Sequence, residues 1–512
     1  MTAIQFKKKL DLDGRKIGLV IPPSPFLLDE RVFVSLGILR VAASLEAHGV
    51  DVGVVDLSGV DNYLDALDSY VETADIEWIG ITCTTPQLPA AVRVANRIRS
   101  IRPNLRIVLG GPHVTLTYSA VKVEQKNKIV NGRAQKAATL LETYFDILVS
   151  GDGELAIFEC FKSDCSKMVD GDDMRGAFFM TNEQYEASDR PARHLVDLST
   201  YHYSIEGHPA TSLIAQLGCP FNCGFCGGRN SRSLRVIRNR SEHSIVEEIR
   251  WLYETYGYTG FMFYDDELNV SKTFVNLMNE LSDLQKELAV EFRLRGFIKA
   301  ELFNEEQAEA MYRAGFRWIL SGFESADPRI LINIDKMATL EDNARVVELA
   351  HKHGLKVKAL MSVGHPGETK DSILSIRNWL IKMRVDDFDC TVITTYPGTP
   401  YYDLAVPHAE PGVWTYTHKR TGDKLHAYEL DHTITADYYK GDPNGGYTAY
   451  VFTDNLSAKE IVELRDIVEK DVRTALNIPF NAGGVAVKFE HSMGQGLPYT
   501  IYKESKKVVD TA

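Results

Sequence analysis

Three cysteines with the spacing of a metal-cluster loop are the strongest chemical signal in this sequence. Cys219, Cys223 and Cys226 fall within eight residues, in a C-x3-C-x2-C pattern flanked by glycines. Thiolates suit iron–sulfur clusters and zinc, and three ligands leave one iron of a [4Fe–4S] cube open for a substrate or cofactor. A structural zinc site normally has a fourth Cys or His, but the next histidines, His208 and His243, lie outside the loop. The pattern favours an open cluster, with structural zinc or buried thiols as the alternative.

A second group of candidate residues follows predicted strands after this loop. From Thr211 to Pro400, six strand patterns alternate with helix patterns, and the cysteine loop follows the first strand, Ser212–Gln216. Six βα units in about 190 residues predict a partial (β/α)6 barrel over residues 206–405. Because barrel chemistry lies at the carboxyl ends of strands, polar residues there are candidates. They are Asp265, Asp266 and Glu267 after strand two, Glu324 and Ser325 after strand four, and the turn containing Gly364 and Gly367 after strand five, with Arg295 inside strand three.

An earlier alternation of strands and helices occupies residues 11–155. Five short apolar strand patterns between Lys16 and Ser150 alternate with helix patterns, which predicts a Rossmann-like, doubly wound parallel sheet. Ligands of such sheets bind beyond the carboxyl ends of the strands. No G-x-G-x-x-G follows the first strand, which argues against a dinucleotide. Three candidate loops fall at the strand ends: Cys83–Gln87, Gly110–His113 and Gly151–Glu154.

The remaining segments carry weaker signals. Residues 156–205 are polar and broken by prolines, which predicts a connector. Residues 406–512 predict a small α+β region that closes the barrel mouth and selects the substrate, and they include an amphipathic helix, Leu456–Leu476, with Ser457 as its N-cap. In this region His432, Tyr438 and Tyr439 are candidates to reach a substrate, with buried, hydrogen-bonded tyrosines as the alternative.

Composition restricts the class of protein. A chain of 512 residues predicts several domains, and a net charge of −13 argues against non-specific binding to nucleic acid or anionic membrane. Neither a signal peptide nor an apolar run long enough to span a bilayer is evident, and the other four cysteines are scattered, so a reducing cytoplasm is expected. A local cluster of arginines forms either a solvated face or a binding site for an anionic cofactor or substrate. Its members are Arg229, Arg232, Arg235, Arg238 and Arg240.

The cysteine loop resembles the signature of the radical S-adenosylmethionine (SAM) enzymes. The resemblance implies a [4Fe–4S] cluster on Cys219, Cys223 and Cys226, with the amino and carboxylate groups of SAM on the fourth iron. One electron then cleaves SAM to methionine and a 5′-deoxyadenosyl radical. It also implies SAM contacts: Phe225, Gly364 and Gly367 beside the adenine, Asp265, Asp266 and Glu267 at the methionine amino group, Arg295 at its carboxylate, and Glu324 and Ser325 at the ribose. The alternatives are helix caps for the acidic residues and an internal ion pair for Arg295.

Residues 11–155 resemble the cobalamin-binding domain that precedes many radical SAM domains. The helix after the first strand, the Gly-Gly-Pro-His turn and the Gly-Asp-Gly-Glu turn occur in the same order. The D-x-H-x-x-G motif that brings a histidine to cobalt in some cobalamin proteins is absent, and His113 is more simply a turn histidine bonded by backbone. An empty Rossmann-like domain is the alternative. The implied cobalamin contacts are Thr84, Thr85, Pro86, Gln87, Gly110, Gly111, Pro112, His113, Gly151, Gly153 and Glu154.

Together, the two resemblances imply a cobalamin-dependent radical SAM methyltransferase acting on an unactivated carbon or phosphorus centre. Its expected cofactors are the [4Fe–4S] cluster, SAM and methylcobalamin, and its expected partners are a small-molecule, natural-product or lipid substrate and an electron donor such as flavodoxin or ferredoxin. One alternative is a cobalamin-dependent cyclase or rearrangement enzyme, because the anaerobic porphyrin-ester cyclases look similar to this chain over the same two domains. The other alternative is a non-catalytic iron–sulfur or corrinoid carrier. Methylthiolation needs a second cluster, and the remaining cysteines form no second triad.

Overall fold

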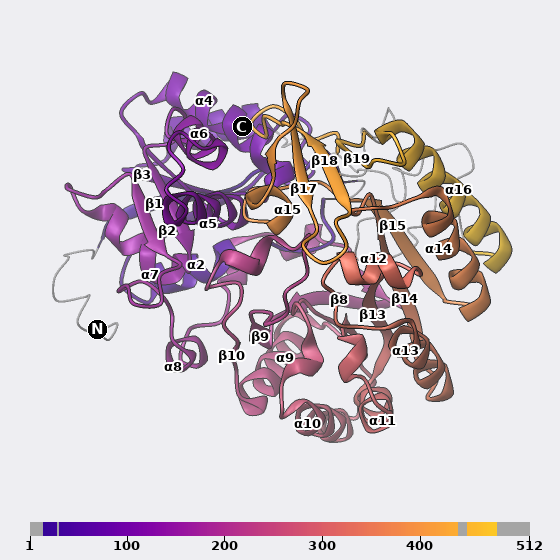
Figure 1. Ribbon diagram of the computed structural model, residues 1–512. Helices are drawn as coiled ribbons and strands as arrows, with labels where there is room; N and C mark the ends of the chain where they lie inside the picture. Colours follow the sequence, from indigo (N-terminus) through magenta and orange to yellow (C-terminus); the bar gives the residue numbers. More distant parts are fainter. Residues whose placement is uncertain (1–13, 28–29, 439–447, 479–512) are drawn as a thin grey trace.

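A six-stranded parallel sheet forms the first unit of the protein. The computed structural model describes residues 14–27, 30–438 and 448–478. The strand order is β2-β1-β3-β4-β5-β6, so the direction of winding reverses beside β1, where doubly wound sheets bind ligands (Figure 1). The predicted strands are confirmed, and the segment predicted as a connector adds a sixth. The strands are β1 (Lys16–Ile21), β2 (Asp51–Asp56), β3 (Trp78–Thr82), β4 (Arg106–Gly110), β5 (Ile147–Gly151) and β6 (Met168–Gly171).

Helices cover both faces of this sheet. One apolar core lies between the sheet and α2, and a second lies between its other face and α3 and α4. The Gly110–His113 segment is more regular than its sequence predicts, because Pro112 starts helix α5 at a position where its missing N–H costs nothing. The helices are α2 (Leu36–Glu46), α3 (Tyr63–Thr73), α4 (Leu88–Ile101), α5 (Pro112–Lys126), α6 (Arg133–Leu141) and the short α7 (Gly153–Ala156).

The second unit is a curled, open half-barrel. Its seven strands lie in the order β15-β14-β13-β12-β11-β8-β7, all parallel except β7 (Ser204–Ile205), which pairs antiparallel with β8. The predicted βα alternation is confirmed. The parallel strands are β8 (His208–Leu213), β11 (Gly260–Phe263), β12 (Arg293–Phe297), β13 (Phe316–Glu324), β14 (Lys356–Val363) and β15 (Asp387–Val392); the helices on the convex face are α9 (Glu242–Tyr256), α10 (Phe274–Leu288), α11 (Glu305–Ala314), α13 (Leu340–Lys352) and α14 (Lys370–Met383).

The loop after β1 reaches from the first unit into the concave face of the half-barrel. Val32 and Phe33 join a small apolar cluster with Tyr203 and Met262. The Phe33 ring lies 4.6 Å from the ring of Tyr203 and 5.5 Å from that of Tyr264. The first unit therefore fills part of the space that a closed barrel would enclose with its own strands.

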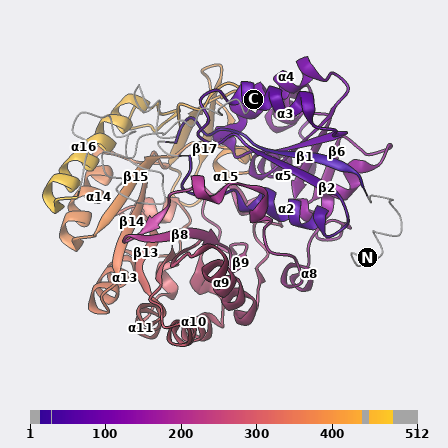
Figure 2. The same cartoon turned by 180° about the vertical axis from the view of Figure 1, so that it is seen from behind.

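Buried polar contacts also join the two units. The Arg238 guanidinium donates to the Asp152 carboxylate at 2.5 Å, and both side chains are buried. The Asp172 carboxylate accepts from the hydroxyls of Ser231 at 2.6 Å and Ser233 at 2.8 Å. Figures 1 and 2 show α5 on the side of the first unit that faces α15 (Pro400–Asp403) of the second. These contacts fix the orientation of the first sheet relative to the half-barrel.

The C-terminal region covers one edge of the half-barrel. A four-stranded antiparallel sheet comprises β16 (Val406–Pro407), β17 (Val413–Thr417), β18 (Lys424–Tyr428) and β19 (Val451–Phe452). Helix α16 (Ala458–Leu476) then packs beside α14 and β15. The predicted N-cap is confirmed, because the Ser457 hydroxyl accepts from the Glu460 N–H. Within the described ranges, no helix is long and apolar enough to cross a membrane.

Two arginines of α16 cap the open edge of β15. Arg465 donates to the Cys390 carbonyl at 2.6 Å, and Arg473 donates to the Phe388 carbonyl at 3.1 Å. Arg473 also lies 3.3 Å from the Asp387 carboxylate, and its side chain is fully buried. An unpaired sheet edge invites pairing with another chain, so these arginines both satisfy the carbonyls and block the edge.

We predict that Arg473→Ala lowers the free energy of unfolding of the half-barrel by about 3 kcal/mol, because it leaves buried carboxylates and a carbonyl short of a donor. Chemical denaturation followed by circular dichroism measures the change. Arg313→Ala is the matched control, since its pair with Glu309 is 2.6 Å long but about half exposed, and it should cost below about 1 kcal/mol. Equal effects of the two substitutions would contradict the role of Arg473 as an edge cap.

Candidate functional site

The cysteine loop is held in shape by hydrogen bonds from outside its own residues. It joins β9 (Gln216–Leu217) to β10 (Arg238–Asn239), which pair antiparallel. Arg235 donates to the carbonyls of Phe221 at 2.9 Å and Pro220 at 2.7 Å, and to the Asn222 side chain at 2.7 Å. The Gly224 N–H donates to the Ile334 carbonyl at 2.6 Å. The loop is therefore preformed before any metal binds.

Close packing explains two glycines of the loop. Gly218 adopts a φ of +89°, and a Cβ there would lie 2.3 Å from the Val236 carbonyl oxygen. A Cβ on Gly224 would lie 2.8 Å from the Tyr401 ring. Both positions require glycine, because a side chain on Gly218 would clash with the segment that returns to β10, and one on Gly224 would separate the loop from the barrel.

The three thiols fit a cluster better than a single ion. All three are partly buried, and burial raises the pKa of Cys219 to about 12 and of Cys226 to about 11. Across the residues that the structure describes, no three His, Cys, Asp or Glu side chains converge as a mononuclear metal ion requires. A [4Fe–4S] cube places each thiolate on a different iron, so its ligands do not need to meet at one point.

The acidic motif after β11 divides into a structural residue and two residues near the loop. The Asp265 carboxylate accepts from the N–H groups of Gln216 at 2.5 Å and Ala215 at 3.2 Å, and so it shapes the chain that leads into the cysteines. Burial raises its pKa to about 7. Burial also raises the pKa of Asp266, and that of Glu267 to about 7 despite the nearby Lys336 and Lys299. The carboxylates of Asp266 and Glu267 have no hydrogen-bond partner among the described residues.

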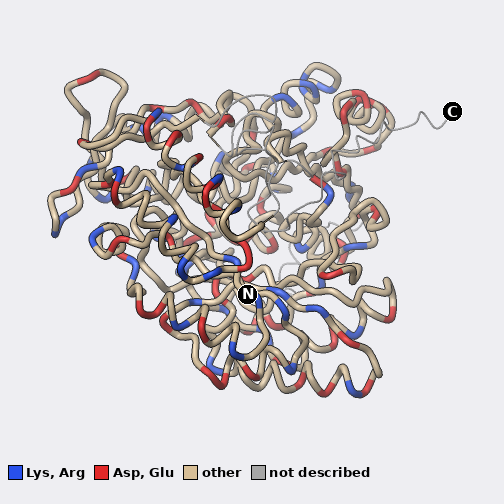
Figure 3. The backbone as a smooth tube through the Cα atoms, turned by 90° about the vertical axis from the view of Figure 1, so that its right-hand side faces the viewer, with Lys and Arg blue, Asp and Glu red and all other residues tan. Residues whose placement is uncertain are grey.

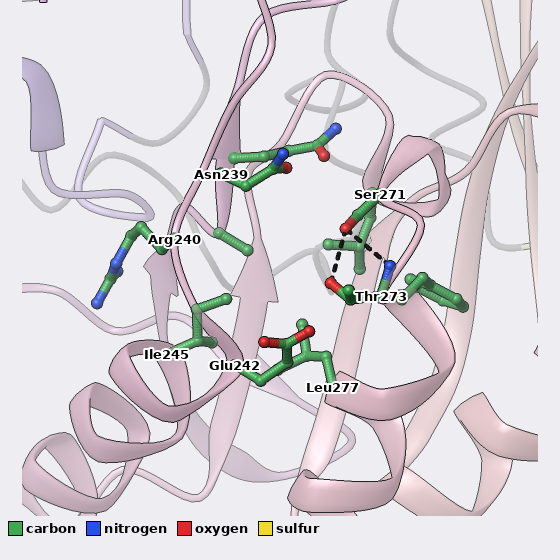
Figure 4. Close-up of a pocket in the computed structure, with 11 residues that line it drawn as sticks. Asn239, Arg240, Glu242, Ile245, Ser271, Thr273 and Leu277 are labelled. Atoms are coloured by element: carbon green, nitrogen blue, oxygen red, sulfur yellow. Dashed lines mark hydrogen bonds between the residues drawn. The ribbon is translucent and has the colours of Figure 1, made fainter. Parts of the chain in front are cut away.

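A small pocket lies beside this motif, between the N-terminal ends of α9 and α10. Figure 4 shows Glu242 on one side of it and the hydrogen-bonded pair Ser271 and Thr273 on the other. Ala215 and Gln216 also line the pocket. The space inside it holds no more than a single water molecule, far less than the range of about 300–1,000 Å³ typical of ligand pockets. We therefore assign it no cofactor.

Two buried lysines complete the surroundings of the cysteines, and the sequence prediction missed both. The Lys336 Nζ lies 3.1 Å from the Glu324 carboxylate, and its positive charge acts on Cys223 and Glu267. The Lys299 Nζ lies 3.0 Å from Glu301 and 4.4 Å from the centre of the Phe221 ring. Neither lysine belongs to a sequence pattern, and only the fold shows that Lys336, 110 residues after Cys226, lies beside the loop.

The backbone at Glu324 is strained. It has a φ of +63°, and the pairing of β13 with β14 shifts between Gly322 and Glu324. Strain of this kind costs about 1–3 kcal/mol and commonly occurs at functional sites. It aims the Glu324 carboxylate at Lys336 and at the Ser362 hydroxyl, 2.7 Å away. Ser325, in contrast, holds the N-cap residue of α12 (Pro328–Asn333), because its hydroxyl accepts from the Asp327 N–H at 3.2 Å while the Asp327 carboxylate caps the helix.

The turn after β14 brings an imidazole to the aromatic residue of the loop. The Glu368 carboxylate accepts from the N–H groups of Gly364 at 2.5 Å and His365 at 2.9 Å, which closes the turn. The His365 ring then lies 5.5 Å from the Phe225 ring and 2.8 Å from the Ser362 hydroxyl. Burial lowers the pKa of His365 to about 4, so the ring is neutral. Gly364 and Gly367 have φ values of +93° and +76°, and the structure places this predicted turn beside Phe225.

Arg295 lies apart from this group. Its register partners are Met262 and Trp318, on the concave face below the strand ends. Its guanidinium lies 5.5 Å from the centre of the Trp318 ring, and its Nε and Nη2 atoms have no hydrogen-bond partner among the described residues. The alternative of an internal ion pair therefore does not hold among the described residues, and the assignment of Arg295 to the methionine carboxylate stays a prediction.

The arginine cluster after the loop forms neither a solvated face nor a single binding site for an anionic ligand. Arg235 pins the cysteine loop, Arg238 joins the two units through Asp152, and Arg240 pairs with the buried Glu248. Arg229 lies 3.6 Å from Asp335, and Arg232 alone is exposed without an ion pair in the described chain. The cluster therefore supports the fold around the loop.

A cavity of about 1200 Å³ opens at the carboxyl ends of the first sheet. Its floor includes Gly110, Gly111 and Gly151, and a Cβ on Gly111 would lie 2.7 Å from the Thr82 hydroxyl. The loops that line it keep close to the sheet because they are built from glycine. Ile214, Leu217 and Leu234 form the opposite wall from the second unit. Of the predicted contacts, Gly110, Gly111, Pro112, Gly151, Gly153 and Glu154 line this cavity.

The other predicted contacts lie beside the cavity. Thr84, Thr85, Pro86 and Gln87 form a short turn, in which the Gln87 Oε1 accepts from the Thr84 N–H at 3.0 Å and its amide donates to the Ser24 hydroxyl at 2.8 Å. His113 is in the first turn of α5, and the hydroxyls of Thr85 at 3.1 Å and Thr117 at 3.4 Å bond its ring. The prediction of a turn histidine bonded by backbone is therefore wrong. Burial lowers the pKa of His113 to about 3.

His113 belongs to an aromatic cluster that spans all three regions. Its ring lies 6.1 Å from that of His432, which lies 5.9 Å from Tyr396 and 5.7 Å from Tyr438. The Tyr438 hydroxyl and the His432 Nδ1 are buried without a hydrogen-bond partner in the described chain, so the alternative of a satisfied tyrosine does not hold for Tyr438. Tyr439, the third candidate, lies outside the described residues.

Comparison with known proteins agrees with both halves of the site. The B12 binding domain model matches residues 30–154, and the Radical SAM superfamily model matches residues 213–380. An uncharacterized methyltransferase of Pyrococcus horikoshii is 28% identical over 488 residues, which cover 91% of this chain and 99% of the relative. The anaerobic magnesium-protoporphyrin IX monomethyl ester cyclase of Rubrivivax gelatinosus is 26% identical over 65% of this chain and 59% of its own.

Solved structures share the fold. The radical SAM methyltransferase TsrM from Kitasatospora setae, with tryptophan and a SAM analogue bound, superposes with a TM-score of 0.62 at 19% identity, covering 79% of each chain. The same protein with cobalamin and a [4Fe–4S] cluster gives a TM-score of 0.59. The glycine-floored cavity and the preformed cysteine loop occupy the two domains that the family models match. The chain belongs to the cobalamin-binding radical SAM enzymes of the methyltransferase-like type, whose cofactors are a [4Fe–4S] cluster, SAM and cobalamin.

Proposed function

We propose that this enzyme transfers a methyl group to an unactivated carbon or phosphorus centre of a small organic molecule, a natural-product intermediate or a lipid. One observation carries the proposal: a single helix, α5, supports both cofactor sites. Its N-terminal end lines the 1200 Å³ cavity through Pro112 and Thr115, and its next turn packs Leu116 against Gly227, directly after Cys226. The two cofactors would therefore face a common space.

The chain's own residues would place and shield the reacting groups. When bound, the cluster and SAM supply hydrogen-atom abstraction and cobalamin supplies the methyl group. Lys336 and Lys299 are buried cations suited to the methionine carboxylate, and Asp266 and Glu267 are acceptors suited to its amino group. Phe225 and the neutral His365, whose rings meet edge to face, offer aromatic contacts for the adenine.

The space left for a substrate favours a compact, partly apolar molecule. Tyr264 follows β11 with 41% of its surface exposed, although Phe33 packs against it. The buried aromatic cluster of Tyr396, His432 and Tyr438 lies near the other side of the mouth. Exclusion of water from such a site protects a radical from side reactions and is the contribution we assign to the C-terminal region.

The Pyrococcus horikoshii relative, named a methyltransferase and similar over nearly its whole length, supports methyl transfer. The cyclase relative keeps cyclisation or rearrangement as the second candidate, because it too is similar over the greater part of this chain. Both reactions need the same two cofactor sites, so only the product separates them.

Incubation with methyl-deuterated SAM tests the proposal. The enzyme, reconstituted without oxygen with cluster and cobalamin, is given a small-molecule extract of cells that lack it, and untargeted mass spectrometry follows the products. We expect 5′-deoxyadenosine together with a product heavier by one trideuteromethyl group. Formation of 5′-deoxyadenosine with an unlabelled product would establish cyclisation or rearrangement as the reaction instead of methyl transfer. An intact cluster that cleaves no SAM would establish a carrier.

Gly37 tests the cobalamin assignment independently of the reaction. It lines the large cavity from α2, and a Cβ built on it meets no atom within 4 Å. Gly37→Phe should therefore fold normally, fill part of the cavity and reduce bound corrinoid by at least about tenfold, as measured from its absorbance bands. Gly37→Ala is the control and should bind like the unaltered protein. Full corrinoid binding by Gly37→Phe would refute the assignment, provided that the variant still reconstitutes its cluster.

Lys336 tests the proposed SAM site. Lys336→Met keeps the length of the side chain but removes its buried charge, and a hydrogen bond to a charged group contributes about 1.5–3 kcal/mol. We expect the Kd for SAM, measured by equilibrium dialysis on the reconstituted enzyme, to rise by about 10- to 100-fold. Lys352→Met on α13 removes an exposed lysine paired with Glu305 and should leave the Kd unchanged. An unaltered Kd in Lys336→Met would exclude this lysine from the site.

A further inference from the structure

A second cavity of about 1200 Å³ lies on the outer side of the cysteine loop. It is lined by Asn222, by α12 and by the segment that links α12 to α13, and it does not include Tyr264, Phe225 or His365 of the barrel mouth. Asn222 stands between Cys219 and Cys223 in the sequence, and Lys336, whose charge acts on Cys223, lines the same cavity. Only one layer of side chains therefore separates the cavity from the cluster ligands.

The cavity has the features of a docking surface rather than of a folded core. Met337 and Ile332 at its edge are 75% and 40% exposed, although both are apolar. Exposed methionine and arginine side chains around an apolar centre are typical of protein interfaces. We define the docking patch as Ile332, Met337, Arg229, Lys419 and Arg420.

The patch is locally basic on an acidic protein. Arg420 lines the cavity, and Lys419 precedes it in the exposed turn between β17 and β18. Neither forms an ion pair in the described chain. Of the two acidic residues that line the cavity, Asp335 lies 3.6 Å from Arg229, and Glu341 alone has no ion-pair partner in the described chain. Figure 3 shows both signs of charge mixed along the rest of the chain, whose net charge is −13.

The turn that carries these cations is fixed in place. The Asp423 carboxylate accepts from Asn333 of α12 at 2.7 Å and pairs with Arg329, and the Thr421 hydroxyl donates to the Asn333 side chain at 2.8 Å. The β17–β18 hairpin therefore holds Lys419 and Arg420 in a fixed position beside α12. A rigid, charged rim favours rapid, oriented encounter with a partner of opposite charge.

We propose that the docking patch is where an acidic one-electron carrier protein binds to reduce the cluster. This inference rests on the proposed function, because only a redox cluster requires such a partner. One electron passes from the reduced carrier to the cluster, so the carrier is oxidised by one electron and the cluster is reduced by one, with no atom transferred. Charge complementarity indicates an acidic partner, because the net negative charge of this protein would repel an acidic carrier and the basic docking patch would attract it.

The experiment uses the reconstituted holoenzyme and two carriers, reduced flavodoxin and reduced ferredoxin. Stopped-flow absorbance without oxygen measures the rate at which each carrier bleaches the cluster band at low ionic strength. We expect the double variant Lys419→Glu/Arg420→Glu to lower the second-order rate by at least about tenfold, and added salt to slow the unaltered enzyme toward the variant. Reduction by dithionite, a small reductant that needs no docking patch, should proceed equally in both.

Lys459→Glu on α16 is the matched control. Its side chain is 87% exposed, and the helix lies against α14 and β15 instead of the cysteine loop. It should leave every rate unchanged. If the double variant is reduced by the carriers as fast as the unaltered enzyme, or if neither carrier reduces a cluster that dithionite reduces, the docking inference is overturned. If the cluster is reduced by dithionite but no SAM is cleaved, it is the proposed function that fails, which separates the two claims.

Discussion

The close approach of α5 to two glycines of the half-barrel sets the geometry of the whole enzyme. A Cβ on Gly227 would lie 2.9 Å from Leu116, and one on Gly398 would lie 2.7 Å from the Leu116 carbonyl oxygen. Contacts as short as these tolerate no side chain. Gly227 follows the last cysteine, and Gly398 lies in the turn after β15. One helix of the first sheet is thus packed against both sides of the second unit's mouth, and its N-terminal end forms the floor of the large cavity.

The charges around the cysteines are arranged for a ligand that carries both signs. Lys336 and Lys299 are buried near Glu267, and burial is the largest cause that raises the pKa of the Asp266 and Glu267 carboxyl groups. Each lysine already pairs with one carboxylate, Glu324 or Glu301, whereas the carboxylates of Asp266 and Glu267 have no hydrogen-bond partner among the described residues. A zwitterion with separate ammonium and carboxylate groups would satisfy both pairs at once. The strained Glu324 backbone fits the same view, since its carboxylate holds Lys336 in position before the ligand arrives.

Much of this fold could be predicted because its signals are local. Strands such as Lys16–Ile21 and Lys356–Val363 are short apolar runs between turn residues, which a pattern search detects, although the first barrel strand, predicted at Ser212–Gln216, runs from His208 to Leu213. The cysteine spacing and the strand-end motifs are also local patterns. Lys299 and Lys336 could not be found in this way, because their neighbours come from distant parts of the chain. Arg295 was assigned from the resemblance, and the register shows only that it stands beside Met262 and Trp318 within the sheet, so its role stays a prediction.

The C-terminal region shows why a chain of this type needs more than its two cofactor units. A half-barrel leaves β15 with free carbonyls and leaves its mouth open to water. Arg465 and Arg473 of α16 close the edge. The rings of His432 and Tyr438 pack against Tyr396, and the His432 ring also lies beside His113 of the first unit. The same region therefore stabilises the barrel and bridges the two units above the cofactor sites. Changes of sequence there would alter the shape of the mouth without disturbing the cysteine loop, which is held from the other side by Arg235 and by the backbone of α12.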